Sequence, residues 1–60
     1  MTVKKFKQTD VYKIAKKVRF FDLNGIDISN KYPLILDLLE IIGYSYSSDG
    51  MIDVDLQYTE

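Results

Sequence analysis

Apolar and polar residues alternate at every second position over residues 52–58. This alternation predicts a strand with one buried face and one face in water. Asp53 and Asp55 lie on the polar face of that strand. Residues 44–47 alternate tyrosine with serine and predict a shorter partner strand. We therefore expect the C-terminal part of the chain to form a β-hairpin.

Two loop lengths would give this hairpin opposite registers. A two-residue turn at residues 49–50 pairs Tyr46 with Asp53 and leaves the tyrosines on the acidic face. A three-residue loop over residues 48–50, with its glycine in the left-handed conformation, pairs Tyr46 with Ile52. The three-residue loop keeps the apolar side chains on one face, so we favour it.

A helical pattern occupies the first third of the chain. Thr9 is a typical capping residue in front of an apolar-periodic run that starts at Asp10. The run places apolar residues at the i, i+3, i+4, i+7 spacing of one helix face, with lysines on the opposite face. This spacing predicts a helix from Asp10 to at least Arg19. The apolar positions are Val11, Ile14, Ala15 and Val18.

The Asn24-Gly25 pair that follows can be interpreted in two ways. It is a strong signal for a two-residue hairpin turn. It is also a suitable left-handed stop for the preceding helix. The hairpin would set Asp22 directly against Asp27, and like charges in that position are unfavourable. We favour the helix stop, with residues 26–28 as a short strand.

A second helix is predicted over residues 34–42, an almost wholly apolar run. Pro33 lies where a first-turn proline is tolerated, and Gly43 is a natural C-terminal stop. Only a narrow acidic stripe interrupts the apolar circumference, so this helix should be covered on most sides. Leu36 is the position that a partner or a second subunit is expected to cover.

Together these elements predict an α+β fold in which two helices pack on a small antiparallel sheet. The order is α-β-α-β-β, ending in a C-terminal β-hairpin. Residues 1–60 are expected to form a single small domain, with residues 1–8 as a loose basic arm or an edge strand. A chain this short buries only about 60% of the surface that it exposes when unfolded. It contains no Cys and so no disulfide, which leaves a homodimer as the available reinforcement.

The composition excludes several kinds of chemistry. The sequence contains no His and no Cys, so no serine has a histidine to activate it and zinc would lack its usual ligands. The acidic residues do not have the spacing of a calcium-binding loop. No apolar run approaches the ~20 residues of a membrane span. We expect a cytoplasmic, non-enzymatic protein with no catalytic residue, metal, cofactor, small-molecule substrate or membrane contact.

The charges are divided between the two ends of the sequence. Residues 1–19 hold seven basic residues and one acidic residue, a net charge of +6. Residues 20–60 hold one basic residue and eight acidic residues, a net charge of −7. The basic end could neutralise phosphates, with Tyr12 and Phe20 interleaved as stacking residues. The candidate nucleic-acid contacts are Lys4, Lys5, Lys7, Lys13, Lys16, Lys17 and Arg19.

The predicted helix followed by a hairpin, over residues 29–58, resembles the last helix and wing of winged-helix DNA-binding domains. The resemblance is one of topology, and it implies a small nucleic-acid-binding regulator. The chain departs from that pattern in its charges. Lys31, Asp37 and Glu40 are the charged residues on the helix that would read DNA, and carboxylates do not replace the side chains that read base edges. The first helix would have to bind the nucleic acid instead.

The overall charge of −1 favours a protein partner over nucleic acid. We therefore expect a small regulator or inhibitor that binds another protein or itself. The composition, rich in Lys, Ile and Tyr, indicates an AT-rich genome and suggests a phage or mobile element as the source. The expected partner-binding residues are Tyr12, Phe20, Leu36, Asp53 and Asp55.

Overall fold

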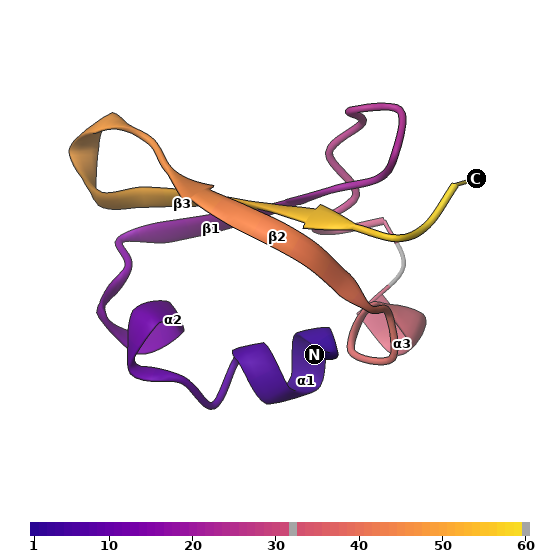
Figure 1. The fold of residues 1–60 in the computed structure, drawn as a ribbon, viewed down its shortest axis with the longest axis horizontal. Coiled ribbons are helices and arrows are strands. Elements are labelled where there is room, and N and C mark those ends of the chain that lie inside the picture. The colour runs from indigo at the N-terminus through magenta and orange to yellow at the C-terminus, as the bar shows by residue number, and fades with distance from the viewer. Residues whose placement is uncertain (32, 60) are drawn as a thin grey trace.

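The computed structural model describes residues 1–31 and 33–59, a small α+β fold with three strands in one mixed sheet. Strand order is β1-β3-β2, with β1 parallel to β3 and β2 antiparallel to it. The helices all lie on one side of this sheet (Figure 1). In chain order the elements are α1 (Val3–Phe6), α2 (Asp10–Ile14), β1 (Lys17–Phe21), α3 (Pro33–Leu36), β2 (Ile41–Tyr46), the 3-10 turn η1 (Ser48–Gly50) and β3 (Met51–Leu56).

The core lies between the helices and the face of the sheet that they cover. Its largest contribution comes from β3, where alternate side chains are buried as the sequence predicts. Helices α1 and α3, strand β1 and the loop after β1 supply the remainder. No helix in the described part of the chain has the length and apolar character needed to cross a membrane. The buried apolar residues are Val3, Phe6, Phe20, Ile28, Leu36, Ile52, Val54 and Leu56.

The C-terminal hairpin has the predicted register. Tyr46 pairs with Ile52, and the loop between β2 and β3 is the three residues of η1. Gly50 is left-handed as expected, with φ of 76°. Asp49 also has a positive φ of 71°, which the prediction did not include. Position 49 is therefore strained, although aspartate tolerates the left-handed conformation better than most residues.

The helix predicted from Asp10 to Arg19 is wrong beyond its first turns. Thr9 caps α2 as predicted, and its Oγ1 accepts a hydrogen bond from the Tyr12 backbone N–H at 3.3 Å. Helix α2 ends at Ile14, and the chain then enters β1. The β-branched and aromatic residues of β1 fit a pleated surface, and pairing with β3 outweighs the local helical spacing.

The helix stop predicted at Asn24-Gly25 is also wrong, because the pair lies in a turn that folds the chain back on β1. Gly25 has φ of 79°, and its N–H donates to the Asp22 carbonyl at 3.0 Å. Phe21 forms an isolated antiparallel bridge with Asp27. The alternative hairpin interpretation was therefore right in kind, with a different register. Asp22 does not face Asp27, so the repulsion that counted against a hairpin does not arise.

The buried helix predicted over residues 34–42 is not present. Helix α3 ends at Leu36, residues 37–39 form a turn, and the end of the apolar run enters β2, in which Gly43 is a strand residue beside a register shift. Pro33 begins α3, at the predicted first position. A helix of four residues cannot act as a recognition helix, so the winged-helix resemblance fails.

The first eight residues are not a loose arm. Val3 and Phe6 of α1 are buried in the core. The Val3 N–H donates to the Leu39 carbonyl at 2.9 Å, and the Ile41 N–H donates to the Met1 carbonyl at 2.8 Å. Residues 1–3 therefore run beside the start of β2. The observed order begins with two short helices, and the sheet is mixed, whereas the sequence predicted one helix at this end and an antiparallel sheet.

Candidate functional site

The five residues predicted to bind a partner do not form one surface. Phe20 and Leu36 are core residues, so their predicted exposure is wrong. Tyr12 is half-buried against the same core. Asp53 and Asp55 lie on the opposite face of the sheet, where Asp53 is half-buried and Asp55 is exposed. These five residues therefore do not make up an interaction surface.

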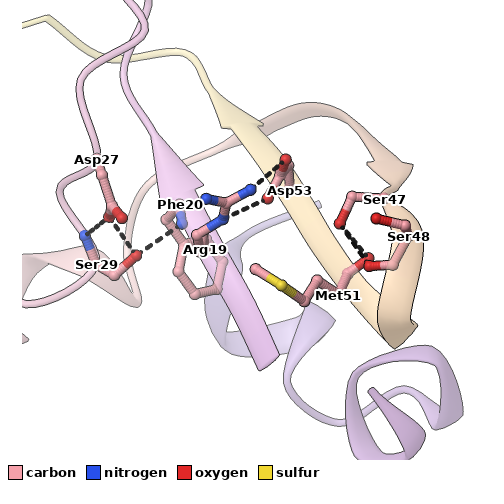
Figure 2. Close-up of polar contacts among 8 residues, drawn as sticks. All are labelled: Arg19, Phe20, Asp27, Ser29, Ser47, Ser48, Met51 and Asp53. Carbon is pink, nitrogen blue, oxygen red and sulfur yellow. Dashed lines mark hydrogen bonds and ion pairs between the residues drawn. The ribbon is translucent and has the colours of Figure 1, made fainter. Parts of the chain in front are cut away.

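Arg19 and Asp53 form a bidentate ion pair on the sheet face away from the helices (Figure 2). The two residues are register partners on β1 and β3. The Arg19 Nε–Asp53 Oδ1 distance is 2.8 Å and the second hydrogen bond is 2.9 Å. The hydrogen bonds to Asp53 raise the pKa of Arg19. The Arg19 guanidinium also lies 5.4 Å from the centroid of the Phe21 ring. Arg19 is thus engaged within the protein and would have to leave Asp53 to bind a phosphate.

The remaining basic residues do not share one helix face. Lys7 forms an ion pair with Asp37 at 2.8 Å. Lys13 lies on α2, whereas Lys16 and Lys17 follow its end. The helical lysine face on which the nucleic-acid prediction rested is therefore absent. Lys4 and Lys5 are exposed on α1.

A short polar network closes the outer edge of β1 (Figure 2). Asp27 Oδ1 accepts hydrogen bonds from the Ser29 N–H at 2.9 Å and the Ser29 Oγ at 2.6 Å. The Phe20 N–H in turn donates to Ser29 Oγ at 2.8 Å. The hydrogen bonds from Ser29 lower the pKa of Asp27. Residues 26–29 therefore occupy the part of the β1 edge that follows Arg19.

A shallow depression beside this network is lined by Asp27, Asn30 and Lys31. It is open to solvent and does not provide the enclosed setting in which such groups gain catalytic function. Within residues 1–31 and 33–59, no three acidic side chains converge to hold a metal ion. Two exposed apolar surfaces, one at α3 and one along β2, are the remaining candidates for an interaction site.

An exposed apolar cluster, consisting of Leu34, Ile35 and Leu38, lies at α3 and the turn after it. Leu34 is 92% exposed and Leu38 is 71% exposed. The Leu38 N–H donates to the Ile35 carbonyl at 3.0 Å, a tight turn that extends α3 and brings Ile35 and Leu38 close together. Leu36 points into the core from the same short segment. The sequence signal for this cluster is the apolar run over residues 34–42, which predicts a buried helix.

A second apolar surface follows the β2 strand. Tyr44 and Tyr46 are exposed, and their rings meet edge to face with centroids 6.0 Å apart. Phe6 connects them to the helices, because its ring lies 5.4 Å from Tyr44 and 5.9 Å from Tyr12. The four rings form an aromatic row from α2 to the edge of the sheet. Tyr12 was predicted to bind a partner, and this row is its setting.

Comparison with known proteins supplies no relative: no family model, curated protein or solved structure matches the chain. Interpretation of the two surfaces therefore depends on their own geometry.

Proposed function

We propose that this chain is a non-catalytic protein-binding module that docks a partner protein through the exposed apolar cluster of α3. The observation that carries the proposal is the exposure of Leu34 and Leu38 in a chain that has few apolar residues to spare for its core. A protein that acts by binding alone would serve as a regulator or inhibitor of its partner.

The physical reason is the free energy available when these side chains are covered. Full burial of a leucine or isoleucine side chain contributes about 1.5–3 kcal/mol. Leu34, Ile35 and Leu38 lie within five residues of each other, so one apolar site on a partner can cover all three. Contiguous exposed apolar residues of this kind mark interaction sites on small proteins.

The surroundings of the cluster favour a protein over nucleic acid. Lys7 and Asp37 neutralise one another next to α3, and Glu40 after the cluster pairs with the N-terminal ammonium of Met1 at 3.1 Å. A phosphate backbone would find little positive charge there. The other five lysines of residues 1–19 are divided between different elements and do not favour a second function. They are Lys4, Lys5, Lys13, Lys16 and Lys17.

The test is site-specific photo-crosslinking in the cells from which the sequence comes. A benzophenone amino acid replaces Leu38, and a matched control carries it at Ile14, which is also exposed but lies outside the cluster. We expect a discrete protein adduct from position 38 that is absent from position 14. Adding Leu34→Ser should abolish the adduct. The proposal fails if position 38 gives no adduct, gives the same adducts as position 14, or crosslinks to nucleic acid.

A further inference from the structure

The two edges of the sheet are protected to different degrees. Strand β1 carries Lys17 and Arg19, and residues 26–29 pair along its far end. Strand β2 carries no charged residue, and residues 41–48 are uncharged throughout. Charged residues are the usual means by which an edge strand resists pairing with another chain. The β2 edge lacks this protection.

The open part of the β2 edge can be defined from its hydrogen bonds. The Ser47 N–H donates to the Met51 carbonyl at 2.9 Å, so Ser47 faces β3. Because facing alternates along an antiparallel ladder, the backbone N–H and C=O groups of Tyr44 and Tyr46 point away from β3. Within the described residues, no partner is found for them. At one end the open part of the β2 edge is limited by Met1, whose carbonyl accepts from the Ile41 N–H. At the other end it is limited by η1, which follows Ser47.

We infer that a second copy of this chain pairs with the β2 edge, antiparallel and about a two-fold axis at Ser45. The result is a closed dimer with one continuous sheet of six strands. This inference rests on the edge of the sheet and is independent of the proposed role of the α3 cluster.

The open edge fits a copy of itself. With Ser45 opposite Ser45 of the second copy, Tyr44 of each chain pairs with Tyr46 of the other. The two outward N–H and two outward C=O groups of each chain then all find partners, giving four hydrogen bonds across the axis. Tyr44 and Tyr46 have their side chains on one face, so four rings gather across the interface, in an arrangement that favours edge-to-face contacts.

Charge favours a second copy over an arbitrary extended partner. The pairing opposes no like charges, because the paired segments are uncharged. The same pairing cannot propagate, because the other edge of each sheet carries Lys17 and Arg19 and is partly covered by residues 26–29. An isologous pair of this kind closes on itself and does not form a filament.

The test is sedimentation equilibrium of the purified chain over a range of concentrations. We expect a species of twice the 7.0 kDa chain mass. Tyr44→Pro removes one outward N–H from each chain without touching the ladder to β3, and should weaken dimerisation by about ten- to hundredfold. Ser45→Lys sets two lysines against each other at the axis and should also dissociate the dimer. Ser48→Lys, the same change outside the open edge, should leave it intact.

The outcomes distinguish this inference from the proposed function. A monomer at millimolar concentration, or assemblies that keep growing with concentration, would overturn the dimer. A dimer unaffected by Ser45→Lys would overturn this interface, even if Tyr44→Pro fails to fold. Leu34→Ser should leave the dimer unchanged while abolishing the crosslink from position 38. Each proposal can therefore fail without the other.

Discussion

Replacing Phe6 by alanine should remove much of the stability of this protein. The Phe6 side chain is 2% exposed, and its ring meets those of Tyr12 and Tyr44. Truncating a buried phenylalanine to alanine costs about 3–5 kcal/mol. At about 0.05–0.15 kcal/mol per residue, a chain of this length is stable by about 3–9 kcal/mol in total. Phe6→Ala should therefore remove roughly a third or more of the free energy of unfolding.

Phe6→Leu gives a graded form of the same test. It keeps an apolar side chain but loses both ring contacts, each worth about 0.5–1.5 kcal/mol, so the expected loss is about 1–3 kcal/mol. Urea unfolding followed by far-UV circular dichroism measures it, at one fixed protein concentration because dimerisation would also shift the midpoint. If the free energy of unfolding falls by about 1 kcal/mol per molar urea, the urea midpoint should fall by about 1–3 M.

Ile14→Ala is the matched control for both Phe6 substitutions. Ile14 is 81% exposed, and its truncation should change stability by less than about 0.5 kcal/mol. If both Phe6 variants unfold at the same urea concentration as Ile14→Ala, then α1 does not belong to the core and the reasoning is refuted.

Three further predictions concern turns and pH. Asp22→Ala should lower the free energy of unfolding in urea by about 2–3 kcal/mol, because the buried Asp22 Oδ1 accepts hydrogen bonds from the backbone N–H groups of Asn24 and Ile26 at 2.9 and 3.0 Å. Asp22→Asn keeps that acceptor and should stay within about 1 kcal/mol of the parent. Equal losses of stability in the two variants would contradict this. Gly50→Ala should cost about 1–2 kcal/mol, because φ is 76° there and a residue with a Cβ adopts that left-handed conformation only at a cost; an unchanged urea midpoint would contradict this. Folding lowers the pKa of Asp27 from its ordinary 3.8, so the contribution of this carboxylate to stability is complete above the unfolded pKa and is lost as pH falls through the folded pKa. The free energies of unfolding of the parent and Asp27→Asn, measured with urea, should therefore converge at acid pH. A difference between them that stays constant down to about pH 2 would contradict this.

The hairpin could be predicted because its signals are local. Alternation over residues 52–58 fixes which face is buried, and only a three-residue loop keeps the Tyr46 side chain on that face. The Thr9 cap is local as well, since its hydroxyl binds a backbone N–H three residues later.

Strand β1 could not be predicted in the same way, because its partner is distant. Lys17 pairs with Met51, and no spacing within residues 10–21 records that pairing. Val18 satisfies a helical spacing from Val11 and an alternating spacing to Phe20, so the local pattern supports both structures. Tertiary pairing with the most buried strand decides between them.

The apolar cluster of α3 was hidden by the same ambiguity. A continuous apolar run shows that burial occurs somewhere, and only the tertiary structure shows that Leu36 turns inward while Leu34 and Leu38 turn outward. The open β2 edge had a clearer signal in its lack of charge. That signal gains meaning only when the segment is known to be an edge strand.

The most direct test of the proposed function is the exposure of individual leucine methyl groups. Their NMR relaxation in the presence of a soluble paramagnetic probe reports how closely solvent approaches each side chain. We predict strong relaxation of the Leu34 and Leu38 methyls and protection of the Leu36 and Leu56 methyls in the same sample. If the methyls of Leu34 and Leu38 are as protected as those of Leu36, the chain covers its own apolar cluster and has no such surface to offer a partner.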